Sequence, residues 1–531
     1  MSLQVPVCII GCGPIGLAGA LLLSKFGIAS LIVERRGDVN THPRSRFVDT
    51  NTMELMRVLG LEKAIEATGL GAEWTGYNRW FNALTRDEVA AIPSPTFHTV
   101  PRETSPTMPV MTCQDYVENV LLSRVAEDDR IEVRYRTEAT QIEEHASGVR
   151  VDIRNVDDDV TTTVQAQYVL GTDGPHSFAR RVIGSEMDAT PRPQYSQDVI
   201  FEAYLAEYVE GRKAGLLYNL TASGVLVFQP LNGMTRWRCQ IFKPDPDLLS
   251  EDETIARIRE AIGVDNVAIS ITSMGIWQPT PGCVDKLSKG RVFLAGDAAH
   301  VSLPTGGMGN NIGFAGVRNL TWKMAYVMHG YVDAGILETY QTEHHALALD
   351  RIAVGIKTTE YMGTFIRAYY QGADIAPGVE LTRQYADYDG ALLGFELKSE
   401  LIAEEAAPPP PVADTTIDFI ACVRAGRRAP HVWVSEAEQR STLDWFDVSY
   451  TLLVGRSVDV QAWQDAMESL GNACPLELRV LDVAHSGPYL PDALVLVRPD
   501  GIVADHWQAA AIRPGEEVAR LQRLLPKQLA G

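Results

Sequence analysis

Gly11-Cys12-Gly13-Pro14-Ile15-Gly16 is the stretch that decides the fold of the N-terminal region. The apolar run Val5–Ile10 before it indicates a buried strand, Leu17–Phe26 after it a helix capped by Gly27, and Ser30–Val33 a second strand. Glycine permits the tight turn and the close approach of a pyrophosphate, and the helix N-terminus offers unpaired N–H groups to phosphates. The sequence therefore predicts a Rossmann-type, dinucleotide-binding unit.

An acidic residue stands where such a unit places one. Glu34 ends the second strand, 18 residues after Gly16. A carboxylate at this position accepts hydrogen bonds from ribose hydroxyls. Cys12 occupies a variable slot of the glycine turn, and we expect it to be inert.

A second glycine-rich segment follows a later strand. The strand Arg291–Ala295 leads into Gly296-Asp297-Ala298-Ala299-His300, and then into Leu303-Pro304-Thr305-Gly306-Gly307-Met308-Gly309-Asn310-Asn311. The loop opens a helix that runs through Asn319 and Trp322. Backbone N–H groups at such a helix start suit an anionic group, such as the N1–C2=O region of a reduced flavin.

A third signature is Gly171-Thr172-Asp173-Gly174-Pro175-His176-Ser177, followed by Arg180 and Arg181. With these three motifs in this order, the chain resembles the class A flavoprotein aromatic hydroxylases of the para-hydroxybenzoate hydroxylase fold. The resemblance covers about 400 residues. It implies FAD as the cofactor, NAD(P)H and O2 as co-substrates, and hydroxylation of an aromatic ring through a C4a-hydroperoxyflavin.

The resemblance also assigns residues to FAD. The pyrophosphate, ribose, flavin and adenine positions fall on Gly11, Gly13, Pro14, Ile15, Gly16, Glu34, Arg35, Arg44, Arg46, Gln114, Ala139, Asp173, Asp297, Pro304, Gly307, Met308, Gly309, Asn310 and Asn311. Asp173 belongs to the motif that serves both FAD and NAD(P)H, and Asp297 matches the ligand of the ribityl chain.

Two of these residues are candidates for a catalytic role. The backbone carbonyl of Pro304 matches one that orients chemistry at the flavin face. Arg46 carries a positive charge that would favour the phenolate form of a phenol, whose pKa is about 10; a role in holding FAD is the alternative for Arg46. The sequence does not single out a catalytic base.

Two positions depart from the family pattern. Gly316 stands where the helix after Asn311 usually carries an acidic residue, and Thr52 stands where relatives often have arginine. Both departures concern local contacts around the flavin loop.

Patterning along the chain predicts four units of an α/β protein. Residues 1–185 form the first part of the FAD-binding domain and 186–278 an inserted antiparallel substrate sheet. Residues 279–405 complete the FAD-binding domain with a helical region, and a Pro-rich linker spans 406–416. Strands such as Gly224–Gln229 and Arg236–Phe242 build the inserted sheet. The predicted substrate contacts on it are Tyr218, Asn219, Phe228 and Pro230.

The tail, residues 417–531, resembles the C-terminal region of the phenol and polyketide hydroxylase branch, a thioredoxin-like domain without redox cysteines. The match rests on 426–433 and 441–444, and a last helix is expected over Glu516–Leu525. Only Cys422 and Cys474 lie in this tail, far apart in sequence, so we expect packing or homodimer formation rather than dithiol chemistry. This branch favours a phenol or a polyketide of secondary metabolism as the substrate.

Composition excludes several other classes. The net charge of −21 argues against a nucleic-acid or anionic-membrane surface. The 7 cysteines are scattered without metal-ligand spacing, which favours reduced thiols in the cytoplasm and no metal site. The apolar start lacks the basic residues of a signal peptide, and we expect no membrane span.

Three alternatives to hydroxylation remain open at this point. A Baeyer–Villiger oxygen insertion beside a ketone would use the same fold. A flavin halogenase would normally show a Trp-x-Trp motif, and none occurs in the sequence. The third alternative is an FAD-binding module without turnover. NADH and NADPH are equally compatible with the sequence.

Overall fold

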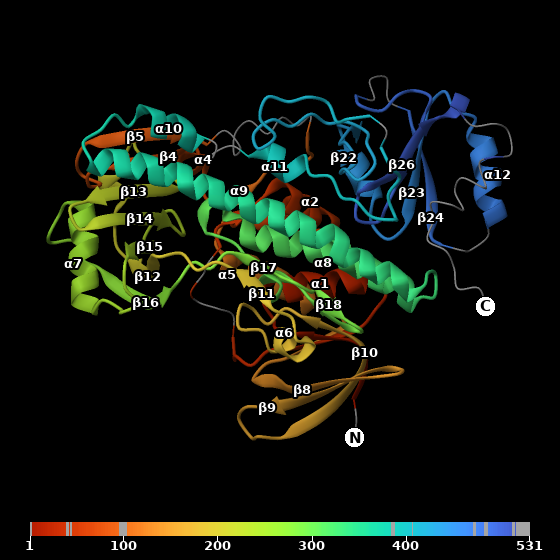
Figure 1. Ribbon diagram of the computed structural model, residues 1–531, viewed down its shortest axis with the longest axis horizontal. Helices are drawn as coiled ribbons and strands as arrows, with labels where there is room; N and C mark the ends of the chain where they lie inside the picture. Colours follow the sequence, from red (N-terminus) through yellow and green to blue (C-terminus); the bar gives the residue numbers. More distant parts are fainter. Residues whose placement is uncertain are drawn as a thin grey trace.

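The protein is described by a computed structural model covering residues 3–38, 42, 45–94, 104–383, 388–405, 407–470, 474–482, 487–511 and 516. Arg44 and, apart from Glu516, the helix expected over 516–525 lie outside these residues. Figure 1 shows a sheet domain with outer helix α7 on one side, a central helical region, and a C-terminal domain on the other side. The fold is a mixed α/β structure, which confirms the expected class.

The first sheet is the predicted Rossmann-type unit. Its strands run in the order β18-β19-β10-β1-β2-β7, and β19, β10, β1, β2 and β7 are parallel neighbours. The hairpin β8–β9 extends it through β10. The bounds are β1 Leu3–Ile10, β2 Ser30–Val33, β7 Ile131–Arg134, β8 Thr137–His145, β9 Gly148–Asn155, β10 Thr161–Gly171, β18 Ser288–Lys289 and β19 Val292–Leu294.

Helices cover this sheet and carry its loops. Helix α1 (Pro14–Lys25) is buried along nearly all of its length and packs on α8 (Met308–Met328) and α5 (Gln114–Val125). Gly27 follows α1 at φ +75°, as a left-handed C-cap requires. The remaining helices of this region are α2 (Thr50–Val58), α6 (Phe178–Ile183), α9 (Thr339–Tyr370), α10 (Ala376–Thr382) and α11 (Asp389–Leu393).

The second sheet has seven strands in the order β16-β12-β15-β14-β13-β4-β5. We call it the substrate sheet. Its bounds are β4 Tyr77–Phe81, β5 Glu88–Pro93, β12 Tyr195–Glu202, β13 Leu216–Thr221, β14 Gly224–Pro230, β15 Arg236–Lys243 and β16 Ser270–Trp277. Strands β4 and β5 come from within residues 1–185, so this sheet draws on more of the chain than the predicted 186–278 segment. Tyr77–Phe81 was missed because it follows short helices and joins the rest of the sheet through β13, which is far away in sequence.

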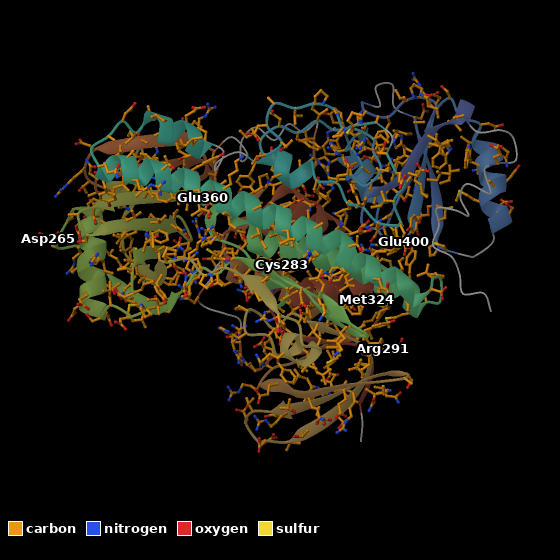
Figure 2. All side chains as sticks on the ribbon, in the orientation of Figure 1. Asp265, Cys283, Arg291, Met324, Glu360 and Glu400 are labelled. Atoms are coloured by element: carbon orange, nitrogen blue, oxygen red, sulfur yellow. The ribbon has the colours of Figure 1, made fainter. Side chains whose placement is uncertain are left out.

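The substrate sheet has two distinct faces. One packs against α7 (Glu251–Ile262) through an apolar core that includes Phe201, Phe228 and Trp237. The opposite face packs against α9 and α10 through Trp80, Tyr218 and their neighbours. In Figure 2, Glu360 marks the part of α9 that lies over this second face.

The C-terminal domain is a four-stranded sheet in the order β24-β23-β25-β26. Strand β23 (Tyr450–Gly455) is parallel to β24 (Leu476–Leu481) and antiparallel to β25 (Ala493–Val497), which pairs antiparallel with β26 (Val503–Gln508). Helix α12 (Val460–Leu470) connects the first two strands. This is the expected thioredoxin-like arrangement. Among the described residues, no helix combines the length and apolar character needed to cross a bilayer.

Candidate active site

The glycine turn is shaped for a phosphate group. A Cβ on Gly16 would lie 2.2 Å from the carbonyl oxygen of Gly11, and one on Gly11 would lie 2.5 Å from that of Thr172. A Cβ on Gly13 would meet nothing within 4 Å, so open space adjoins this glycine. Gly13 caps α1 without a side-chain hydrogen bond, Pro14 follows it, and no acidic residue lies in the first turn. The N–H groups of this helix start are thus left for an anionic ligand.

Glu34 is held ready at the end of β2. Its Oε2 accepts from the N–H of Cys12 at 3.0 Å, and its Oε1 accepts from the N–H of Arg36 at 2.9 Å and from Nε of Arg36 at 3.1 Å. Burial alone would raise the pKa of this carboxyl, but these hydrogen bonds and the charge of Arg36 outweigh it and lower the pKa. The ionised group can still accept hydrogen bonds from a ribose. The neighbouring Arg35 is exposed.

The loop before α8 has the same character as the first turn. Gly306 and Gly307 both have positive φ, +82° and +61°. A Cβ on Gly307 would lie 2.9 Å from Cβ of Phe47. Helix α8 begins at Met308 without a capping side chain and without an acidic residue in its first turn. Its first N–H groups therefore suit the electron-rich edge of a reduced flavin.

Asn311 fixes the position of this helix start. Its Oδ1 accepts from the N–H of Asp49 at 3.0 Å and from Oγ1 of Thr52 at 2.8 Å. Its Nδ2 donates to the carbonyls of Phe47 at 3.1 Å and Gly307 at 2.8 Å. The side chain is fully engaged within the protein, so any flavin contact of this segment comes from the backbone.

The third motif joins the other two. Oγ1 of Thr172 donates to the carbonyls of Ile10 and Gly11, each at 3.0 Å. Arg180 donates to the carbonyl of Ala298 at 3.1 Å and so links this motif to the loop of Asp297. Asp173 accepts from the N–H groups of Phe178 at 2.6 Å and Ala179 at 3.1 Å, which makes it a cap of α6.

Arg46 is buried and links the FAD-binding domain to the substrate sheet. Its Nη1 donates to the carbonyl of Gly215 at 3.0 Å and its Nη2 to that of Pro230 at 2.7 Å. The next residue, Phe47, is the one that meets Gly307. A single short segment therefore contacts both the substrate sheet and the start of α8.

The other predicted FAD residues lie around these elements. Gln114 begins α5, where its Nε2 donates to Glu118 at 2.7 Å. Ala139 is half-buried in β8. Asp297 lies in the short 3-10 turn after β19 and is only partly buried, as a ribityl ligand requires. Pro304 is exposed, and its carbonyl accepts from the N–H of Gly307 at 3.0 Å, which leaves a second lone pair.

The face of the substrate sheet that meets α9 carries a row of polar and aromatic side chains. The strand register aligns Asp198, Gln240, Val227, Tyr218 and Trp80 across five neighbouring strands. The rings of Tyr218 and Trp80 stack with centroids 4.6 Å apart and an interplanar angle of 4°. These side chains are buried against α9 and α10, so the row joins two stacked aromatic rings to a buried amide and carboxylate.

A buried ion pair lies at one end of this row. Arg238 donates to Asp198, which also accepts from Nε1 of Trp277 at 3.1 Å. Gln229 donates through Nε2 to Oε1 of Gln240 at 2.9 Å. These hydrogen bonds fix the positions of the Asp198 carboxylate and of the Gln240 amide oxygen.

Two donors on this face have no partner. Nε1 of Trp80 and Nε2 of Gln240 are buried and make no hydrogen bond to the residues that the structure describes. A buried polar group without a partner costs roughly 1–3 kcal/mol. Both donors lie on the same face and in the same row, which fits a bound molecule with hydrogen-bond acceptors.

Helix α9 sets the distance between this row and the flavin loop. Near its middle, Oγ1 of Thr305 donates to the carbonyl of Gly355 at 3.3 Å and also bonds to Thr359. Further along, Phe365 packs edge-on against Trp80 with centroids 5.4 Å apart. Six residues of helix correspond to about 9 Å. The row and the flavin loop thus lie on adjacent stretches of one helix, which Figure 1 shows crossing the molecule.

The four predicted substrate residues do not share one face. Tyr218 lies in the row just described. Phe228 lies on the opposite face, in the core against α7, with Phe201 at 5.9 Å. Asn219 follows Tyr218 and so points to that opposite face as well, where its Nδ2 donates to Leu217. Phe228 and Asn219 therefore lie on the face that packs against α7, away from the row. Pro230 contributes its carbonyl to Arg46.

The sequence interpretation missed Trp80, Gln240 and the Asp198–Arg238 pair. A signal for two of them was present: in β15, polar Arg236, Arg238 and Gln240 alternate with apolar residues. Regular alternation in a buried strand indicates one face that meets a polar site. Trp80 gave no such signal.

The two departures from the family pattern have structural counterparts. A Cβ on Gly316 would lie 2.6 Å from Nε2 of His344, so the imidazole fills the space that an acidic side chain would need. Thr52 is buried in α2, where its N–H donates to the carboxylate of the N-cap residue Asp49 and its Oγ1 donates to Asn311. His344 is therefore an interior residue.

All 7 cysteines are unpaired thiols. Burial raises the pKa of Cys12 and of Cys474 to about 12. Neither thiol is a nucleophile at neutral pH.

The glycine turn, the ionised Glu34 and the uncapped start of α8 together fit FAD. These features define a flavoprotein. The comparisons with known proteins agree: residues 4–353 match the FAD binding domain model, and residues 423–528 match the model of the C-terminal domain of aromatic-ring hydroxylases. The chain belongs to the FAD-dependent aromatic-ring monooxygenase family.

Individual relatives extend along the whole chain. The chain is 30% identical to 4-methyl-5-nitrocatechol 5-monooxygenase of Burkholderia sp over 98% of its length and 96% of that protein. It is 29% identical to a putative polyketide hydroxylase of Streptomyces halstedii, with 97% and 95% covered. Among solved structures, the flavin-dependent monooxygenase PieE with FAD and substrate has a TM-score of 0.89 at 25% identity, covering 98% and 99%. Aklavinone-11 hydroxylase with FAD and aklavinone has a TM-score of 0.85 at 26% identity, covering 99% of each chain.

Proposed function

We propose that the protein hydroxylates a phenolic or polyketide aromatic ring that binds on the α9-facing side of the substrate sheet, with NAD(P)H and O2 as co-substrates. The observation that carries the proposal is the row containing the unpartnered donors of Trp80 and Gln240. Phenol and quinone oxygens are acceptors of the kind these donors require. The relatives named above act on a nitrocatechol and on polyketides, which supports the same class.

When bound, FAD supplies the electron transfer and the oxygen activation. The chain's own residues position the two reactants. The ring is held by stacking beside Tyr218 and by hydrogen bonds from Gln240 and Trp80, and α9 sets the distance between this row and the loop of Pro304. The Arg46 guanidinium remains charged and lies between the two halves, where its field favours an ionised phenol. The N–H groups of Arg46 donate to carbonyl oxygens, and because the guanidinium is already protonated it does not act as a base.

The first test is a screen of phenols and aromatic polyketides for stimulated NAD(P)H oxidation by the FAD-loaded enzyme. We expect a product that has gained one oxygen atom as a ring hydroxyl, with that atom labelled when ¹⁸O2 is supplied. A protein that takes up no FAD, or that consumes NAD(P)H at one rate whatever aromatic compound is added, would contradict the proposal.

Variants then test the binding face. Gln240→Leu and Trp80→Phe each remove one donor, and we expect KM for the best substrate to rise about 10-fold, the equivalent of ~1.4 kcal/mol. Cys239→Ala is the matched control, because Cys239 neighbours Gln240 but belongs to the core against α7. Equal KM values in Gln240→Leu, Trp80→Phe and the control would place the ring elsewhere.

The proposal also includes a cytoplasmic location and a homodimer. Unpaired thiols agree with a reducing compartment. Light scattering of the holoenzyme in solution gives its mass directly, and a monomer at micromolar concentration would remove the homodimer from the proposal.

A further inference from the structure

A second site lies far from the substrate sheet, between α2, α8, α9 and the C-terminal domain. It is a cavity of about 40 Å³ whose lining includes Asn51, Arg318, His344 and Asp500. A single water needs roughly 10–15 Å³ by this kind of measure. The cavity therefore has room for more than one water, or for one small ion.

Arg318 is the unusual residue in this lining. It makes no hydrogen bond and no ion pair to any residue in the described part of the chain. The carboxylates of Glu54, Asp500 and Asp447 attract it only at longer range. Each already has a closer partner: Glu54 binds Arg428 through two nitrogens, Asp500 binds Arg498 at 2.5 Å, and Asp447 binds Lys25 at 2.8 Å.

The charges around the cavity do not balance. Five cations and four carboxylates gather in this region: Lys25, Arg318, Lys323, Arg428, Arg498, Glu54, Glu343, Asp447 and Asp500. Each carboxylate is bonded to a cation other than Arg318, so the surplus positive charge lies on Arg318. This side chain is partly buried, and a charge withdrawn from water without a bonded counter-charge is unfavourable.

Two further features make this a built site. Gly501 has φ +81°, and a Cβ there would lie 3.2 Å from Nη2 of Arg318, so this glycine leaves room for the guanidinium. His344 also lines the cavity, and its buried Nδ1 has no hydrogen-bond partner among the described residues. Its Nε2 lies 3.3 Å from Nε2 of His300. When Nε2 of His344 accepts a hydrogen bond from His300, His344 carries its proton on Nδ1, which is then an N–H donor.

We propose that this cavity binds a small monovalent anion, a halide or a carboxylate of the size of formate, as the counter-charge of Arg318. The ion would connect α8 of the FAD-binding domain with the turn that holds Asp500 and Gly501 in the C-terminal domain. The site is independent of the substrate face and of FAD chemistry.

The test uses the FAD-loaded enzyme in potassium chloride, formate or gluconate at equal ionic strength, since gluconate is too large for the cavity. We expect Tm to rise saturably with chloride or with formate relative to gluconate, which also tells the two ions apart. Arg318→Gln should show one Tm in all three salts. Arg456→Gln, which removes an exposed charge from the C-terminal domain, should respond like the wild type.

Bromide soaked into crystals gives a second, direct measurement. We expect an anomalous peak beside the Arg318 guanidinium in the wild type and none in Arg318→Gln. Equal Tm values of the wild type in all three salts, or a salt response that Arg318→Gln retains, would overturn the proposal. A wild-type cavity that shows only water in bromide-soaked crystals would overturn it as well.

Discussion

Glu343 on α9 is the residue whose replacement should weaken the contact between the FAD-binding and C-terminal domains most. Its carboxylate is fully buried and accepts five hydrogen bonds, from Asn319, Lys323, Ser399 and both Nη atoms of Arg498. Oε1 accepts two of these bonds and Oε2 three. In Glu343→Gln, the new NH2 group must therefore face at least two donors, whichever way the amide is turned.

The same substitution removes a negative charge from a buried cluster. Asp500 then remains as the carboxylate of this cluster that balances the charges of Lys323 and Arg498. Removing one partner of a buried ion pair typically costs about 3–5 kcal/mol. We expect the free energy of unfolding of Glu343→Gln to fall by about that amount, measured from urea midpoints with the tryptophan fluorescence of the holoenzyme. Trp322, bonded to Asp500 at 3.1 Å, reports on this interface.

Two further variants make the reasoning refutable. Lys323→Met combined with Glu343→Gln restores the charge balance, so the double variant should be more stable than Glu343→Gln alone. Glu400→Gln makes the same change at an exposed site nearby, marked in Figure 2, and should stay within about 0.5 kcal/mol of the wild type. A Glu343→Gln protein as stable as Glu400→Gln, or a double variant no better than the single one, would refute the account.

The effect has a defined pH dependence. Burial alone would raise the pKa of Glu343, but the charges of Arg498 and Lys323 and the hydrogen bonds hold it well below its usual range. A depressed carboxyl pKa stabilises the fold above the unfolded-state pKa of about 4.3 and loses this contribution as the pH falls. The difference between wild type and Glu343→Gln should shrink below about pH 4. It is best followed below pH 6, because the pKa of Lys323 is lowered to about 8 by burial and adds a second titration at higher pH.

Three other predictions concern the FAD site. Gly16→Ala should yield protein without bound FAD, because its Cβ would lie 2.2 Å from a carbonyl oxygen of the glycine turn; the flavin absorbance of the purified protein measures this. Glu34→Gln should weaken FAD binding about 10- to 100-fold, as expected for a loss of ~1.5–3 kcal/mol in charged hydrogen bonds. Because the pKa of Glu34 is lowered, the FAD affinity of the wild type should stay constant from pH 8 down to pH 5. Asn311→Ala should lower both Tm and FAD affinity, since four hydrogen bonds that hold the start of α8 disappear.

Each of these has its own control. Gly27→Ala changes a glycine with open space around it and should keep full flavin content at reduced stability. Glu127→Gln makes the same change as Glu34→Gln at an exposed position and should leave FAD affinity unchanged. Asn119→Ala removes an exposed asparagine side chain and should leave both Tm and FAD affinity unchanged. Yellow, FAD-saturated Gly16→Ala protein, a Glu34→Gln affinity equal to that of the control, or an Asn311→Ala protein as stable as Asn119→Ala would count against the respective prediction.

Elements with strong local signals were predictable from the sequence. The strand Ser30–Val33 has the predicted bounds, and the strands predicted over Gly224–Gln229 and Arg236–Phe242 each extend one residue further. The glycine motifs specify backbone geometry by themselves, so they identify the strands and helices that flank the FAD site.

What the sequence did not reveal depends on tertiary pairing. Strand β4 joins the substrate sheet by parallel pairing with β13, more than 130 residues away, and this pairing brings Trp80 beside Tyr218. The face of the sheet on which Phe228 lies likewise depends on how its strand pairs with its neighbours. The use of Arg46 and Asn311 as internal connectors depends on partners from distant segments, which no local pattern encodes.

Helix α9 has a consequence for how such enzymes diversify. The flavin loop contacts Gly355 and Thr359, and the row that we propose binds the ring contacts Phe365, so one continuous helix supports both. Side chains on the sheet can be exchanged without altering the position of the flavin loop. One residue inserted between Thr359 and Phe365, in contrast, would rotate the contact with the flavin loop by about 100° relative to the contact with Trp80. Substrate range is therefore open to change by point substitution, while the length of α9 is not open to insertion or deletion.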